Sequence, residues 1–339
     1  MKNSKIGICV IGAGRAGMIH AKNFARGGPH VKLVVVADPV KEAAQKACRE
    51  LELTTYYLDY HEALQDTHID AVVVVSPTVY HKEIVVAAAQ AGKHILCEKP
   101  MAMTGVECDE MIAAVERNQV KLQIGFMRRF DKSFMCAKDR IVNGDIGDVV
   151  LVKSLTRGPS IPQRWQYDIV KSNGPLAEVN SHDIDTLRWF TESEFKEVYA
   201  IAGNYRCPEA REEFPDFYDN VVMTALFENG MQGCIDGAVS VRYGYDARVE
   251  IVGTKGVLFV GRLHEHEVVV CNQETGLVTP FTKSWRTLFM EAYMAEDNDF
   301  IACIVEDRSP KVTGIDGKMA VNVVNAGNQS IREKRPVRL

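Results

Sequence analysis

The sequence predicts an α/β protein of two joined domains: an N-terminal doubly wound parallel sheet and a C-terminal α+β domain with an open, largely antiparallel sheet. The chain of 339 residues is long enough for about two domains of ordinary size. Short apolar runs alternate with helical patterns over the first third, and longer strand patterns joined by turns follow. We place the boundary at residue 125, which gives domains over residues 1–125 and 126–339.

Five short apolar runs predict the strands of the first domain. They are rich in Val and Ile and do not alternate with polar residues, as expected where helices cover both faces of a parallel sheet. These runs are Ile6–Ile11, Leu33–Ala37, Ala71–Ser76, His94–Cys97 and Lys121–Ile124. The helical patterns between them cover Gly17–Ala25, Lys41–Leu51, His81–Ala91 and Gly105–Asn118.

Longer strand patterns predict the sheet of the second domain. Asn229-Gly230 separates two of them and supplies the positive φ angles of a hairpin turn. The predicted strands are Val149–Thr156, Val198–Gly203, Val221–Glu228, Met231–Ser240, Arg248–Val252 and Val257–Val260. Helices are expected over Pro175–Thr191, Trp285–Val305 and Gly317–Glu333.

Composition excludes several classes of protein. A 46% hydrophobic and 25% charged chain is neither disordered nor a coiled coil. The formal charge of −5 without a Lys/Arg block gives little support to a nucleic-acid or membrane-surface role. Nine cysteines without a C-x-x-C pair favour reduced thiols. Because no apolar run approaches the length of a membrane span, we expect a cytoplasmic protein.

A glycine-rich loop predicts a dinucleotide site. The segment "GAGRAG" is G-x-G-x-x-G, follows a predicted strand and opens a predicted helix. Gly12 permits the tight turn, Gly14 lets a pyrophosphate approach the backbone, and Gly17 lets helix and strand pack closely. Arg15 and Ala16 lie in the same loop, at a helix N-terminus that favours phosphate. The alternative is a structural turn that binds nothing.

Asp38 ends the second predicted strand, 21 residues after Gly17. An acid at this place accepts hydrogen bonds from the adenosine ribose and repels a 2′-phosphate, so NAD is favoured over NADP. Lys41 lies close enough to soften this preference. The alternative for Asp38 is an ordinary turn-initiating aspartate.

Two segments carry candidate chemistry for hydride transfer, which requires a group that takes the alcohol proton. The segment "CEKP" places Glu98 and Lys99 at the strand edge where ligands bind in open α/β sheets. In "NGPLAEVNSHDID", a continuous helix would put Glu178, His182 and Asp185 on one face, where a carboxylate can orient the imidazole. The alternatives are a solvated lysine and a polar helix face.

In order and spacing, these segments resemble the Gfo/Idh/MocA oxidoreductase family over nearly the whole chain. The motifs that carry the resemblance are "GAGRAG", "SPTVYH", "CEKP", "GFMRRFD", "EVNSHDID" and "VNAGNQSIREKRPV". Within the family, "GFMRRFD" and "YGYDARVEIVG" are most similar to inositol 2-dehydrogenase-type members. The resemblance implies a Rossmann domain packed against a predominantly β domain, in a homodimer or homotetramer.

The resemblance also implies roles for individual residues. Lys99 and His182 are expected to be catalytic, with His182 as the proton acceptor and Glu178 beside it. Residues expected by the cofactor, besides the loop and Asp38, are Ser76, Pro77, His81, Glu98 and Lys99. Residues expected to contact the substrate are Lys99, Arg129 or its neighbour Arg128, Trp165, Tyr167, Glu178, His182 and Tyr245.

One departure concerns the substrate. Many family members carry an aspartate four residues before the histidine, where this chain has Glu178, which is longer by one methylene. Trp165 and Tyr167 belong to an insert over residues 157–168 that we place near the site; they could stack on a sugar face or pack within their loop. His264 and His266 alternate on a predicted strand without a visible third ligand, so no metal is expected.

The sequence thus predicts an NAD-dependent dehydrogenase that oxidises a secondary hydroxyl of a cyclic polyol or sugar to a ketone. One alternative is an aldose or other sugar dehydrogenase of the same family. The other is a protein that senses NAD(H) without turnover, although such a protein would need neither Lys99 nor His182.

Overall fold

The structure, a computed structural model, describes residues 5–339 and divides the chain into two compact units. Unit 1 runs to Met127 and includes Glu291–Val321, and unit 2 comprises Arg128–Met290 and Asn322–Leu339. The division expected from the sequence assigned all of residues 126–339 to the second domain. In the structure, residues 291–321 belong with the first unit instead.

The sheet of unit 1 is the predicted parallel one. Its strand order is β2-β1-β3-β4-β5, and every neighbouring pair is parallel. All the carboxyl ends of these strands therefore lie at one edge, where the glycine-rich loop follows β1 and Lys99 follows β4. The strands are β1 (Ile6–Ile11), β2 (Val31–Ala37), β3 (Ala71–Val74), β4 (His94–Glu98) and β5 (Leu122–Gly125).

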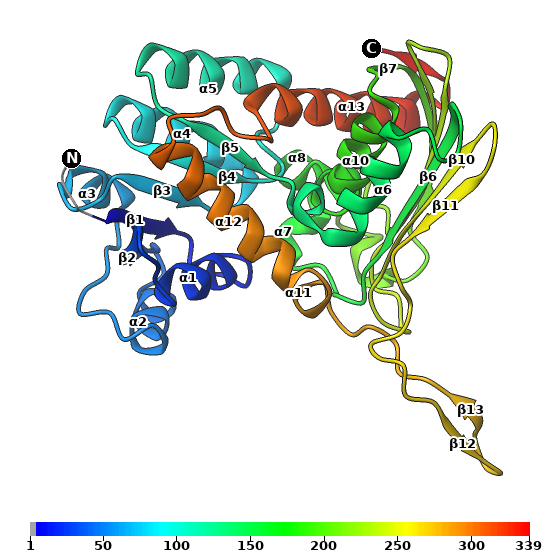
Figure 1. Cartoon of the computed structure of the whole chain (residues 1–339), viewed down its shortest axis with the longest axis horizontal. Helices are drawn as coiled ribbons and strands as arrows, with labels where there is room; N and C mark the ends of the chain where they lie inside the picture. Colours follow the sequence, from blue (N-terminus) through cyan, green and yellow to red (C-terminus); the bar gives the residue numbers. More distant parts are fainter. Residues whose placement is uncertain (1–4) are drawn as a thin grey trace. The chain divides into compact units, whose positions relative to one another are not determined.

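Helices lie on both sides of this sheet, with α4 and α5 side by side on one and α1 and α12 on the other (Figure 1). Helix α12 packs through Phe300 and Ile301 into a core with Ile8, Phe24 and Leu96. The helices of unit 1 are α1 (Gly17–Ala25), α2 (Lys41–Glu50), α3 (Tyr60–Gln65), α4 (His81–Gln90), α5 (Gly105–Arg117), α12 (Met290–Val305) and the start of α13 (Gly314–Glu333), with the short turn η1 (Thr78–Tyr80).

The sheet of unit 2 is open and largely antiparallel, as predicted. Its order is β11-β10-β6-β9-β8-β7-β14, and the pair β6–β9 is parallel. β12 and β13 form a separate hairpin that the sequence analysis did not predict (Figure 1). The strands are β6 (Val149–Arg157), β7 (Phe195–Gly203), β8 (Asn220–Phe227), β9 (Gln232–Ala238), β10 (Asp246–Gly253), β11 (Val257–Val260), β12 (Val270–Asn272), β13 (Gly276–Val278) and β14 (Val337–Arg338).

Helix α10 packs on β6 and β9 in unit 2 and carries His182 in its first turn. The helices of this unit are α6 (Lys132–Val142), α7 (Arg164–Tyr167), α8 (Ile169–Ser172), α9 (Gly174–Glu178), α10 (Ser181–Thr191), α11 (Trp285–Leu288) and the end of α13, with the short turns η2 (Met127–Phe130) and η3 (Pro208–Ala210).

Two predictions for unit 2 are wrong. The single helix expected over Pro175–Thr191 is broken at Val179–Asn180, so Glu178 ends α9 whereas His182 and Asp185 belong to α10. A side-chain hydrogen bond stabilises the break, because the buried Asn180 amide donates to Asp183 in α10. Gly237 has no side chain and so leaves space for Asn180. The strand expected around His264 and His266 is also missing: His264 forms only an isolated bridge with Phe281.

Among residues 5–339, no helix combines the length and the apolar character that crossing a bilayer requires.

Phe300 tests whether α12 is an integral part of unit 1. Its side chain is fully buried in the core that contains β1, β3 and β4 residues. We expect Phe300→Ala to cost about 3–5 kcal/mol of unfolding free energy, measured by urea denaturation. Val305→Ala, on the exposed end of the same helix, serves as the control and should cost much less. A cost below about 1 kcal/mol for Phe300→Ala would contradict this packing.

Candidate active site

The glycine-rich loop has the geometry of a phosphate cradle. Gly12 has a φ of +106°, and a Cβ there would lie 2.6 Å from the Val75 carbonyl oxygen. A Cβ at Gly17 would lie 1.8 Å from the Gly12 carbonyl oxygen, whereas a Cβ at Gly14 would meet no atom within 4 Å. The first and third glycines are therefore required by the protein's own packing. The space in front of Gly14 is free for a cofactor, so the loop fits a dinucleotide.

Asp38 holds the same loop. Its Oδ2 accepts a hydrogen bond from the Ala13 amide at 2.8 Å, and its Oδ1 accepts one from the Val40 amide at 2.8 Å. Each carboxylate oxygen can accept further hydrogen bonds. Asp38 can thus fix the loop and still accept hydrogen bonds from the ribose hydroxyls of NAD.

Lys99 follows β4, and the residue before it is deeply buried. Glu98 is 5% exposed, and its Oε1 lies 3.0 Å from His20 Nε2. Glu98 Oε2 accepts a hydrogen bond from the Lys99 amide at 3.1 Å. A Cβ at Gly125 on the neighbouring strand would lie 3.0 Å from the Glu98 carboxyl carbon, so β5 leaves room for this carboxylate.

His81 fixes the main chain on the other side of Lys99. Its Nδ1 lies 2.8 Å from the Pro100 carbonyl oxygen and its Nε2 lies 2.8 Å from the Ser76 carbonyl oxygen. Burial lowers the pKa of His81, although the two carbonyls oppose that effect. The resemblance places His81 beside the cofactor. Because the ring is 1% exposed, we infer that it acts by joining the loop after β3 to the turn after β4.

In unit 2, the residue next to His182 anchors the start of α10. Asp183 is fully buried; its Oδ1 accepts hydrogen bonds from Arg128 at 2.9 Å, Ser154 at 2.5 Å and Thr156 at 2.9 Å. Burial alone would lower the pKa of Arg128, but Asp183 and Tyr245 together outweigh it and the pKa is raised. Arg128 is therefore a buried structural cation that ties α10 to β6.

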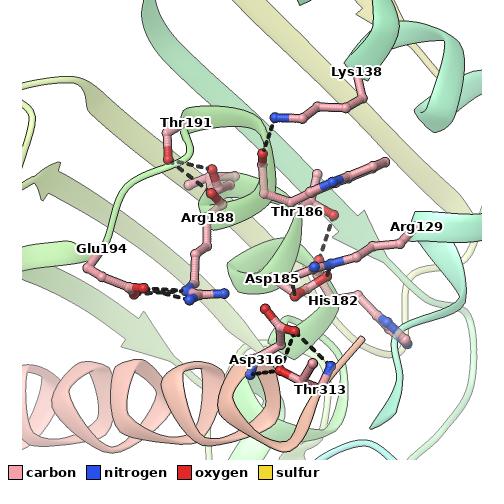
Figure 2. Close-up of polar contacts among 12 residues, drawn as sticks. Arg129, Lys138, His182, Asp185, Thr186, Arg188, Thr191, Glu194, Thr313 and Asp316 are labelled. Atoms are coloured by element: carbon pink, nitrogen blue, oxygen red, sulfur yellow. Dashed lines mark hydrogen bonds and ion pairs between the residues drawn. The ribbon is translucent and has the colours of Figure 1, made fainter. Parts of the chain in front are cut away.

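Arg129 and Asp185 form the neighbouring ion pair (Figure 2). Arg129 donates to Asp185 through Nε at 3.0 Å and through Nη2 at 2.6 Å. The Thr186 hydroxyl donates to the His182 carbonyl at 2.7 Å, one turn along α10. Asp185, expected to hold the His182 ring, thus bonds the guanidinium expected to reach the substrate. Glu178, at the end of α9, accepts a hydrogen bond from Gln166 at 3.3 Å.

The three aromatic candidates for substrate contact lie in different surroundings. Tyr167 is buried with Phe217 and Cys207, and its hydroxyl donates to Glu209 at 2.6 Å, which favours a packing role. Tyr245 is also buried, and its hydroxyl bonds Arg128; burial raises the pKa of this phenol. Trp165 is half-buried and its indole N–H donates to Gln163, so it is the aromatic candidate with surface to offer.

The sequence analysis did not single out His20, Glu296 or Asp297, which surround Glu98 in unit 1. The ligand atoms of His20, Glu98 and Glu296 lie within 4.8 Å of one another, which makes them the group within residues 5–339 that could hold a metal ion. The signal for His20 was its place three residues after Gly17, on the buried face of α1. Glu296 and Asp297 gave no such signal, because they lie almost 200 residues after Glu98 in the sequence.

The two glycines provide a matched pair of tests for the cofactor loop. Gly17→Ala places a methyl group against a backbone carbonyl, so we expect it to destabilise the protein by about 1–3 kcal/mol. Gly14→Ala meets no protein atom, so stability should stay within about 0.5 kcal/mol while NAD affinity falls at least about tenfold. Calorimetry and NAD titration measure both. Wild-type NAD affinity in Gly14→Ala would refute the cradle.

The family of the chain follows from comparison with known proteins. Residues 6–126 match the oxidoreductase family with an NAD-binding Rossmann fold (Gfo/Idh/MocA), and residues 138–339 match its C-terminal alpha/beta domain. The chain is 34% identical to the scyllo-inositol 2-dehydrogenase (NAD(+)) of Bacillus subtilis, over 97% of this chain and 95% of that protein. It is 33% identical to the myo-inositol 2-dehydrogenase of Thermotoga maritima, over 98% of each.

The fold also matches a scyllo-inositol dehydrogenase of Lactobacillus casei solved with NAD(H) and scyllo-inositol. The TM-score is 0.90, with 28% identity over 99% of each chain. The phosphate cradle of unit 1 agrees with the match to the NAD-binding domain of the family. The C-terminal domain of the family matches the rest of the chain. The chain therefore belongs to the Gfo/Idh/MocA family and is an NAD-dependent oxidoreductase.

Proposed function

We propose that the protein oxidises one secondary hydroxyl of an inositol-like cyclic polyol to a ketone, with NAD⁺ as the oxidant. The observation that carries this proposal is the similarity, over nearly the whole chain, to proteins named as myo- and scyllo-inositol dehydrogenases. A polyol offers only hydroxyl groups, so it is bound by hydrogen bonds and not by ion pairs. Lys99, Glu178 and Arg129 supply side chains able to form them.

His182 is the proposed proton acceptor. A neutral imidazole has one ring nitrogen that can take the hydroxyl proton. The start of α10 is held by the buried Asp183, so the histidine backbone has little freedom to shift. Lys99 would donate to the same substrate oxygen and stabilise the negative charge that develops on it.

In this proposal His182 would take the hydroxyl proton. NAD⁺, which the glycine-rich loop and Asp38 would hold, would supply nicotinamide C4 as the hydride acceptor. The C–O bond becomes a carbonyl. Glu178 is the residue proposed to select among ring hydroxyls, because it lies at the end of α9, four residues before His182.

We also propose that the protein forms a homodimer or homotetramer. Apolar side chains on the strands of the unit 2 sheet support self-association, because Ile201, Val222 and Phe259 are exposed in the single chain.

The reaction is tested by NADH formation with myo-inositol, scyllo-inositol and common pyranoses. We expect an inositol to be oxidised with the highest kcat/KM. Lys99→Ala and His182→Ala should each lower kcat about 100-fold or more, because each removes a group that assists proton transfer. The exposed Lys46→Ala and His61→Ala are matched controls with wild-type turnover.

Other outcomes discriminate the alternatives. Faster turnover of an aldose would replace the inositol assignment by a sugar dehydrogenase. NAD binding without turnover of any polyol or sugar would support a sensing role. Wild-type turnover in both Lys99→Ala and His182→Ala would refute the mechanism.

Glu178→Asp tests substrate selection. The shorter side chain withdraws the carboxylate by one methylene, so a hydrogen bond to one ring hydroxyl is lost or gained. We expect the ratio of kcat/KM for myo- and scyllo-inositol to change about tenfold, the effect of one hydrogen bond. Glu213→Asp, at a half-exposed surface position, is the control. An unchanged ratio would remove Glu178 from the specificity determinants.

A further inference from the structure

A cluster of four ionisable side chains lies in the interior of unit 1, and one of them, Glu98, accepts a hydrogen bond from the Lys99 amide. It consists of His20 from α1, Glu98 from β4, and Glu296 and Asp297 from α12; we call it the buried acid cluster. His20 and Glu296 are fully buried, and Asp297 is 2% exposed. Three carboxyl groups are thus buried beside one imidazole. Burying their charges costs free energy unless those charges are compensated.

His20 is held between two carboxylates. Its Nδ1 lies 2.6 Å from Asp297 Oδ1, and its Nε2 lies 3.0 Å from Glu98 Oε1. Ionised carboxylates only accept hydrogen bonds, so both ring nitrogens must carry protons to satisfy both contacts. Burial by itself would lower the pKa of His20, but Asp297 and Glu98 outweigh it and raise the pKa well above its ordinary value. The ring is therefore a buried cation.

Glu296 is placed differently. Among residues 5–339, no group donates a hydrogen bond to either of its carboxyl oxygens, although both are buried. The cation on His20 is already shared by Glu98 and Asp297, so an ionised Glu296 would be an uncompensated charge in the interior. Where two carboxyl groups share one site, one of them keeps its proton.

The surroundings of Glu296 act in the same direction. Burial is the largest effect that raises its pKa, and Glu98, Asp297 and Asp299 add to it, while His20 opposes it. A divalent cation would be the other way to compensate the three acids. It would need a ring nitrogen of His20 as a ligand, but both nitrogens already face carboxylates, Nδ1 that of Asp297 and Nε2 that of Glu98, and the ring already supplies positive charge.

We propose that Glu296 holds a proton in the folded protein and that, together with His20, it is a positioning residue for Glu98 and for the main chain of Lys99. Because a neutral Glu296 neither repels Glu98 nor competes for the His20 cation, Glu98 Oε1 stays paired with His20. Glu98 in turn accepts the Lys99 amide through its second oxygen. This proposal rests on the catalytic role of Lys99 proposed above.

The proton is tested by Glu296→Gln, which keeps the shape of the side chain and cannot ionise. The infrared spectrum of the wild type near neutral pH should contain a protonated-carboxyl C=O band that Glu296→Gln lacks. Glu42→Gln, at an exposed position on α2, should leave this band unchanged. Absence of the band from the wild type would overturn the proposal.

Thermal melting gives the second readout. The unfolded chain releases the Glu296 proton near the ordinary pKa of glutamate, whereas the folded protein keeps it, so the wild type loses stability as pH rises between the two values. From about pH 5 to about pH 8, the melting temperature of the wild type should fall more steeply than that of Glu296→Gln. Parallel curves, or a stoichiometric divalent metal whose removal by EDTA lowers the melting temperature, would overturn the proposal.

Positioning is tested through His20→Gln, Glu98→Gln and the double variant. Each single variant should lower kcat about tenfold or more while the KM for NAD⁺ changes little. The double variant restores a neutral hydrogen-bonding pair and should recover part of the loss; strictly additive losses would refute action through Glu98. If the wild type oxidises no polyol, the proposed function fails, while the infrared band and the melting curves still decide the proton.

Discussion

In each unit, a buried carboxylate held by a buried cation stands next in sequence to the candidate catalytic side chain. Glu98, bonded to His20, precedes Lys99, and Asp183, bonded to Arg128, follows His182. Breaking such a pair leaves an uncompensated charge in the interior, at a cost of about 3–5 kcal/mol. The main chain at both positions therefore cannot shift without losing that pairing, and each candidate catalytic side chain starts from a fixed Cα.

These two buried pairs also place neighbouring residues in different surroundings. At the start of α10, two adjacent residues have different surroundings. Asp183 is fully buried and bonded to β6, whereas His182, the proposed proton acceptor, is 6% exposed. At the edge of the parallel sheet, Glu98 points into the core and Lys99 follows outside the strand. The two candidate catalytic residues thus each lie one position away from a buried anchor, which is how a rigid element can present a reactive group.

Local patterns predicted much of this fold, because apolar runs, glycine turns and capping boxes depend on neighbouring residues. Thr104 and Glu107, for example, form a capping box at the start of α5, a contact between residues three apart in sequence. Features that depend on distant contacts were missed. The break before α10 needs the space at Gly237, and the return of α12 to unit 1 needs the core around Phe300. Likewise, Lys99 and His182 could be named from their motifs, whereas His20 was not singled out and Arg128 was considered only as a substrate contact, not as the buried partner of Asp183.

The break between α9 and α10 also separates Glu178, which we propose sets specificity, from His182, the proposed proton acceptor. On one continuous helix, a change at Glu178 would be transmitted to His182 through the i to i+4 backbone bonds. Here Glu178 ends its own short helix, while the first turn of α10 is held by Asp183 and Asn180. A glutamate can therefore stand at position 178 in place of an aspartate without moving His182. Because the proteins named as myo- and scyllo-inositol dehydrogenases match this chain at 33% and 34% identity, overall similarity does not choose between the epimers. We propose that this choice depends on a few side chains such as Glu178, which can vary while the backbone at His182 stays in place.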